Sequence, residues 1–204
     1  MLVENINTTL TGNNKKNEPH DKGWAILEQG TIALVVLFVI VVVLGSLYAL
    51  RTRANVATET ANIQTIITSA QSLLKGSDGY TFTSSAKMTG ALIQMGVIPS
   101  GMTVQGDKTS GTATLYNAWG GAVTVAPAST SGFNNGFTVT YDKVPQDACI
   151  QIATRISKTG LTNGTTLNST AHSDGKVTTE EASTQCKADN GSTGTNKLIF
   201  TING

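Results

Sequence analysis

Residues 29–50 read QGTIALVVLFVIVVVLGSLYAL, a run of 22 residues without a charged side chain. About 20 apolar residues are enough for a helix to cross the hydrocarbon core of a bilayer. A secretory signal peptide has a shorter apolar core, followed closely by a small-residue cleavage site. Here Arg51, Arg53 and a helix-favouring stretch follow instead. The run therefore predicts a retained membrane anchor.

Charges on the two sides of this run leave its orientation open. Arg51 and Arg53 follow it, and residues 1–23 hold three lysines balanced by three acidic residues: Lys15, Lys16, Lys22, Glu4, Glu18 and Asp21. The positive-inside rule, which compares Lys and Arg across the membrane, does not settle such a case.

Glu28 stands immediately before the apolar run. An acidic residue at the centre of a membrane helix costs about 2.5–3.5 kcal/mol on insertion scales. One interpretation places Glu28 at the headgroup level as an ordinary flanking residue. The other gives its carboxylate a function.

The segment around Glu28, KGWAILE at residues 22–28, resembles the processing site of type IV prepilins. In that family a polar leader ends in Gly, a hydrophobic residue becomes the new N-terminus, and Glu occupies the fifth mature position before a long apolar helix. The resemblance implies that a prepilin peptidase cleaves between Gly23 and Trp24 and that the new amine of Trp24 is methylated. The 23-residue leader, and Trp24 in place of Phe, favour the type IVb subclass.

The helical pattern continues beyond the apolar run, and no proline interrupts residues 24–75. These 52 residues would form a helix about 78 Å long, and Gly76 to Gly79 supply a stop. Apolar residues recur at three- and four-residue spacing on one stripe. They are Ile63, Ile66, Ile67, Ala70, Leu73 and Leu74.

The two halves of this helix need different surroundings. The half at residues 24–50 would lie in the membrane or the filament core, and the amphipathic half at 51–75 would pack on a domain. A membrane-tethered coiled-coil stalk is the alternative, although the stripe is short for sustained heptads. Gly45 is either a tolerated glycine, as is common in membrane helices, or a point where the helix unwinds during assembly.

Residues 76–204 are predicted to form the globular head. The pattern predicts a helix at Ser84–Gly96, with Met88, Leu92 and Met95 on one side, and a second helix beginning at Pro145, with Cys149, Ile152 and Ile156 inward. Strands are expected at Thr112–Asn117, Ala122–Ala126, Phe137–Tyr141 and Leu198–Ile202, the last of them central because it is so apolar. Helices with antiparallel strands in this order predict an α+β fold.

The head also carries a family resemblance. ALIQMGVIPSGM (91–102), NAWGGAVTV (117–125) and FTVTYDKVPQDAC (137–149) are similar to segments of the major pilins of conjugative-plasmid thin pili and of enteric pathogens. Residues 161–195 match no fixed motif and are rich in Thr, Asn, Gly and Ser, so we expect a variable loop region there. Cys149 and Cys186 would stay reduced in a cytosolic protein, but in an exported one a single disulfide is favoured.

No pattern for catalysis or metal binding stands out. The net charge of +1 would not attract nucleic acid or an acidic substrate. His172, beside Asp174, lacks a nucleophile motif, and we interpret it as a solvated loop histidine. Residues 189–192 lack the spaced acids of a calcium loop and are expected to form a turn. The sequence predicts no enzyme, metal or cofactor.

The prediction is therefore a structural subunit, with a leader at 1–23, a core half at 24–50, an amphipathic half at 51–75 and a head at 76–204. The major pilin of a type IVb pilus would pass from the inner membrane into an extracellular filament of identical subunits, used for attachment, conjugation or aggregation. Its other partners would be the prepilin peptidase and the inner-membrane assembly machinery. Alternatives are a minor pilin, a secretion-system pseudopilin, or a membrane-anchored enzyme or binding domain, which would need neither cleavage nor Glu28.

Overall fold

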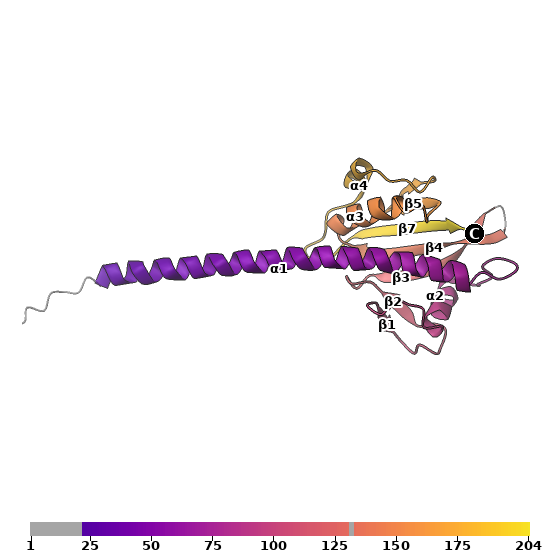
Figure 1. Cartoon of the computed structure of the whole chain (residues 1–204), viewed down its shortest axis with the longest axis horizontal. Helices are drawn as coiled ribbons and strands as arrows, with labels where there is room; N and C mark the ends of the chain where they lie inside the picture. The colour runs from indigo at the N-terminus through magenta and orange to yellow at the C-terminus, as the bar shows by residue number, and fades with distance from the viewer. Residues whose placement is uncertain (1–21, 131–132) are drawn as a thin grey trace, which may run out of the picture. The chain divides into compact units, whose positions relative to one another are not determined.

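The computed structural model describes residues 22–130 and 133–204, apart from the side chains of 22–30, 48–53 and 130. The chain divides between Tyr48 and Ala49 into an N-terminal unit and a globular unit, residues 49–204. Figure 1 labels the elements in chain order. They are α1 (Lys22–Leu73), α2 (Ser85–Gln94), β1 (Thr103–Gln105), β2 (Thr114–Tyr116), β3 (Ala122–Thr130), β4 (Phe133–Val144), α3 (Gln146–Ser157), β5 (Gly164–Leu167), β6 (Thr170–His172), α4 (Thr179–Gln185) and β7 (Asn196–Asn203).

Helix α1 has the predicted length of 52 residues but begins and ends two residues earlier than expected. The stripe from Ile63 to Ala70 is buried, as predicted, but Leu73 is 49% exposed. Leu74, which follows the last helical residue, is buried instead. Leu73 is thus the one predicted member of the stripe that is not buried, and beyond Leu74 the chain turns back through a bridge between Gly76 and Gly79.

The seven strands found in the described residues form one antiparallel sheet, in the order β1-β2-β3-β4-β7-β5-β6. Strand β7 lies between β4 and β5 and pairs with both (Figure 1). Leu198 is therefore opposite Tyr141 on one side and Leu167 on the other. The predicted central position of the last strand is confirmed. Strands β3 and β4 are longer than predicted, because their pairing continues through polar and small residues such as Ala128 and Gly136.

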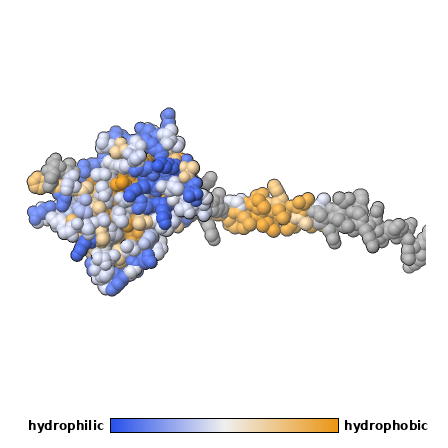
Figure 2. All heavy atoms as spheres, turned by 180° about the vertical axis from the view of Figure 1, so that it is seen from behind, coloured by the Kyte–Doolittle hydropathy of each residue, from blue (hydrophilic) through white to orange (hydrophobic). Residues whose placement is uncertain are grey.

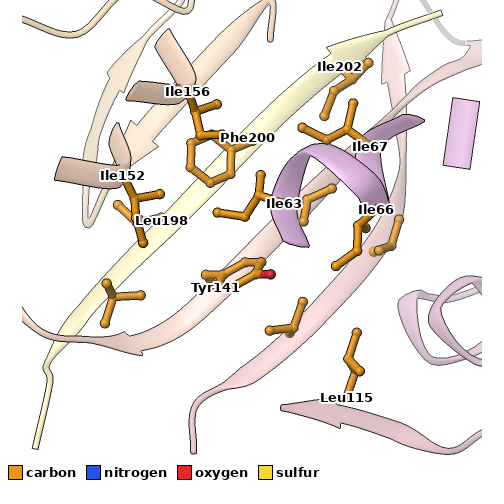
Figure 3. Close-up of a cluster of buried hydrophobic side chains, with 14 of the residues drawn as sticks. Ile63, Ile66, Ile67, Leu115, Tyr141, Ile152, Ile156, Leu198, Phe200 and Ile202 are labelled. Carbon is orange, nitrogen blue, oxygen red and sulfur yellow. The ribbon is translucent and has the colours of Figure 1, made fainter. Parts of the chain in front are cut away.

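The core of the globular unit lies on one face of this sheet. Figure 3 shows Ile63, Ile66 and Ile67 of α1 facing the strands, with Ile152 and Ile156 of α3 beside Phe200. All of these side chains have 0% exposure. Full burial of each aliphatic or aromatic side chain contributes about 1.5–3 kcal/mol. Packing on the sheet therefore stabilises the second half of α1.

Helices α2 and α3 confirm most of the predicted pattern. Cys149, Ile152 and Ile156 are buried on α3, as expected. On α2 Met88 and Leu92 are buried, but Met95 is 51% exposed and the prediction that it shares their side is wrong. The helix ends at Gln94, and Gly96, with φ of 68°, turns the chain away.

Residues 161–195 are not the loop region predicted from composition. They contain β5, β6 and α4, and β5 extends the sheet by pairing with β7. Helix α4 begins with a capping box, in which Thr178 and Glu181 each accept a hydrogen bond from the other's backbone N–H. The Thr- and Asn-rich composition of this region is therefore compatible with strands and a capped helix, and it does not indicate an irregular loop.

Candidate functional site

The described part of the N-terminal unit presents an apolar surface. Every large apolar side chain from Ile32 to Leu47 is between 49% and 70% exposed, and Figure 2 shows these residues as a continuous orange stretch. A helix that is apolar on all sides needs an apolar environment around it. Lipid or other helices of the same kind would supply one.

Searched over the residues that the structure describes, the chain contains no helix long and apolar enough to cross a membrane. The predicted anchor, residues 29–50, extends past the described side chains at both ends.

The predicted processing and assembly residues lie at the beginning of α1. Gly23, Trp24 and Glu28 fall within the helix, but their side chains are outside the described residues. The roles predicted for them stay predictions. Gly45 is also helical, and a Cβ added there would meet no atom within 4 Å. Whether α1 unwinds at Gly45 stays a prediction too.

A disulfide joins Cys149 of α3 to Cys186 at the end of α4, across 37 residues, and confirms that prediction. Asn196 and Asn168 reinforce this junction. The Asn196 amide donates to the carbonyls of Val144 and Lys187 and accepts from the Lys187 N–H and the Asn168 amide. Residues 161–195 are therefore fixed to the sheet by covalent and polar links.

Helix α1 also carries a buried acidic residue, Glu59, that we did not predict from the sequence. Glu59 is 1% exposed and accepts hydrogen bonds from the Ala118 N–H at 2.7 Å and the Asn62 amide at 3.2 Å. The hydroxyl of Tyr141 also bonds to it. Burial raises the pKa of Glu59, and these hydrogen bonds partly oppose the rise. A signal was present, because Glu59 lies at helical spacing between Val56 and Ile63 on the apolar stripe.

His172 is not the solvated loop residue that we predicted. It ends β6, its side chain is 11% exposed, and its Nε2 lies 2.9 Å from Oε1 of Gln185. The strand pairing of residues 161–172 was not visible in the sequence, so its burial was missed. The expected turn near Asp189 is present as a bridge between Asn190 and Thr193. Within the described residues, no group of three His, Cys, Asp or Glu side chains could hold a metal ion.

Comparison with known proteins gives a consistent result. The family model described as PilS N terminal matches residues 53–203. The crystal structure of type IV b pilin from Salmonella typhi is 55% identical, with a TM-score of 0.65, and the match covers 72% of this chain and 99% of that one. The NMR structure of the type IVb pilin PilS from Salmonella typhi is also 55% identical, with a TM-score of 0.52, 73% coverage here and 96% there. No curated protein matches.

The globular unit has an α+β fold, with the second half of α1 packed on its core, and the chain is 55% identical in sequence to the Salmonella typhi pilin. These findings define a type IVb pilin, which is a structural subunit of an extracellular pilus. Within that class, the chain belongs to the PilS family. The predicted family, fold class and pilin function are thereby confirmed. The family match begins at residue 53, so it does not include the predicted processing site.

Proposed function

We propose that this chain is the precursor of the major subunit of its pilus. A prepilin peptidase removes residues 1–23 by cutting between Gly23 and Trp24, and the new amine is methylated. Residues 24–50 hold the subunit in the inner membrane until the assembly machinery extracts it. The mature subunit then polymerises into the filament, and no catalytic step of its own is involved.

One observation carries this proposal: the large apolar side chains between Ile32 and Leu47 are exposed along a helix that begins at Lys22, beside the predicted cleavage site. A single copy of the chain leaves that surface uncovered. Lipid before assembly, and the helices of other subunits after it, would each cover it. This two-stage burial explains why one sequence segment serves in both places.

Mass spectrometry of filaments sheared from cells tests the proposal. We expect this chain to be the most abundant protein, with Trp24 as its methylated first residue. An intact leader in filaments, or a mature start at another residue, would contradict the processing step. Low abundance beside another pilin would assign the chain to the minor pilins instead.

The role proposed for Glu28 follows from the same cleavage. A new α-amino group has an unperturbed pKa of about 7.7–8 and is largely cationic at neutral pH. Glu28 lies four residues, about one helical turn, from Trp24. Pairing of its carboxylate with the Trp24 amine of an adjacent subunit would align the two helices in one axial register.

A further inference from the structure

Glu59 is a buried acidic residue in the globular unit, and the assembly role proposed for the apolar half of α1 does not explain it. Its carboxyl group is almost fully enclosed in the core of the globular unit. Among the described residues no Lys, Arg or His forms an ion pair with it. A buried carboxylate without a cation destabilises a fold unless hydrogen bonds compensate for the lost water. The arrangement around Glu59 should therefore serve a purpose.

Three donors from three elements converge on this carboxyl group. Asn62 comes from α1, Tyr141 from β4, and the Ala118 N–H from the loop between β2 and β3. Tyr141 is fully buried and its hydroxyl also lies 4.0 Å from Sδ of Met102. Glu59 thus connects α1, the sheet and a loop at a single point.

The loop at residues 117–121 is held in one conformation by its own contacts. The Asn117 carbonyl oxygen Oδ1 accepts from the N–H groups of Trp119 and Gly121, and its amide donates to the carbonyl of Asp142. A Cβ at Gly121 would lie 1.7 Å from that same carbonyl, so only glycine fits there. The loop is a preformed unit, and Trp119 packs from it against the core.

We propose that Glu59 is a positioning residue whose carboxyl group latches the 117–121 loop to α1, and that protonation of this group favours the closed loop because closure removes the carboxyl group from water. In this proposal, binding of a proton to Glu59 is coupled to movement of the 117–121 loop, which carries Trp119. Opening of the loop would break the Ala118–Glu59 hydrogen bond and admit water to the carboxyl group.

The direction of the pH effect follows from burial. In the closed loop, burial raises the pKa of Glu59, whereas in an open loop the hydrated group returns to its ordinary value. The closed form therefore binds the proton more tightly. Closure is most favoured below the ordinary pKa of a glutamate, and this advantage is lost as pH rises through the raised value. Between the two values the ratio of closed to open loop changes by up to about tenfold per pH unit.

The titratable groups near Glu59 do not account for the pH effect assigned to it. Among the described groups that shift the pKa of Glu59, Tyr141 is the one other titratable side chain. Its pKa is raised well above the ordinary value by burial and by the nearby Glu59 charge, so it stays neutral across the relevant range. The carboxylate of Asp142 lies 3.6 Å from Lys197 and is more than one-third exposed.

The first test uses the full chain in detergent micelles, labelled with 5-fluorotryptophan. The two tryptophans give two fluorine resonances, and Trp119→Phe identifies that of Trp119. In the wild type, the chemical shift of the Trp119 resonance should change with pH, with a midpoint above the ordinary pKa of a glutamate. The control variant Glu180→Gln, a matched change at an exposed glutamate, should behave in the same way. In Glu59→Gln the resonance should not move with pH. Equal pH responses in the wild type and in Glu59→Gln would overturn the proposal.

A second measurement needs no substitution at Glu59 and so does not depend on that variant folding. The Glu59 carboxyl carbon and the hydrogen-exchange protection of the Ala118 amide are followed by NMR on the wild type. Protection corrected for intrinsic exchange should rise as pH falls, with the midpoint at which the Glu59 carbon titrates. A Glu59 midpoint at or below the ordinary value, or Ala118 protection that ignores this titration, would refute the latch.

Discussion

At the scale of single residues, Asn196 does more for this fold than its place among polar residues would indicate. It is fully buried at the start of β7, and its amide makes four hydrogen bonds to three separate segments. Asn168, at φ of 57°, faces it and donates to the Gln185 carbonyl. Asparagine tolerates this left-handed conformation better than most residues. The amide groups of Asn196 and Asn168 thus find hydrogen-bond partners for both their nitrogen and their oxygen atoms.

Asn196→Ala should therefore destabilise the globular unit by about 3 kcal/mol, because it leaves several buried backbone groups without partners. Urea unfolding of the full chain in detergent measures this loss. Asn190→Ala is the matched control, because Asn190 is exposed, and it should change stability by no more than about 0.5 kcal/mol. Equal stability of the two variants would show that the Asn196 contacts are dispensable.

At the scale of elements, α4 depends on its connections. It has seven residues, and among them Ala182 is the buried one. So short a helix is marginal in isolation. The capping box at its start and the disulfide at its end hold it beside α3 (Figure 1). Tertiary links, more than intrinsic helix propensity, stabilise this element.

Replacement of both cysteines, Cys149→Ser with Cys186→Ser, should lower the free energy of unfolding by about 4 kcal/mol on the chain-entropy model for a 37-residue separation. Denaturant unfolding with and without reductant provides the measurement. Reductant should destabilise the wild type and leave the double variant unchanged. Cysteines that react with an alkylating agent in native, unreduced pili would contradict a bond in the assembled subunit.

Gly45 offers a test of the helix as an assembly element. Alanine fits without a clash and adds about 1 kcal/mol of helix stability. If α1 must unwind at this point during assembly, Gly45→Ala should yield fewer filaments while the globular unit unfolds at the same denaturant concentration. Gly30→Ala, at the other glycine of the apolar run, is the control. Normal filament yield from Gly45→Ala would make Gly45 an ordinary tolerated glycine.

At the scale of the whole molecule, the cut after Gly23 is expected to prepare the membrane-anchored precursor for assembly into the filament. Gly23→Phe places a bulky side chain at the predicted cleavage site, so the peptidase should leave the variant as uncut precursor. Intact mass spectrometry of the membrane fraction distinguishes it from mature protein. Lys22→Gln, the neighbouring change, should be processed. Cleavage of Gly23→Phe at the normal position would place recognition elsewhere.

Glu28→Ala should be inserted, cleaved and folded like the wild type, yet yield few or no filaments. A carboxylate without a partner in the filament core would carry a cost of several kcal/mol, so pairing with a Trp24 amine favours one stagger between subunits. Glu28→Asp, a methylene shorter, should give an intermediate filament yield, and Gln29→Ala a normal one. Immunoblotting of sheared filaments against total cell protein supplies the ratio. Wild-type yield from Glu28→Ala would return Glu28 to an ordinary flanking role.

Much of this architecture is encoded locally and was predictable from the sequence. The long helix followed from periodicity without proline, α3 from the spacing of Cys149, Ile152 and Ile156, and the central place of β7 from its apolar run. In each case the pattern of side chains within one segment is enough, because burial of one face is what the segment requires. The roles of Gly23, Trp24 and Glu28 were instead assigned through the resemblance of residues 22–28 to a prepilin processing site, and they stay predictions.

The secondary structure of residues 161–195 and the hydrogen-bond partners of Glu59 were determined by the tertiary structure. The four residues of β5 become a strand because β7 offers an unpaired edge, and Asn196 supplies a buried partner for Asn168. Glu59 is tolerated in the core because Ala118, distant in sequence, turns its N–H toward the carboxyl group. The position of Glu59 on the apolar stripe indicated burial, but the sequence did not show which groups would bond to its carboxyl group. The burial of a polar side chain depends on partners that only the folded chain brings together.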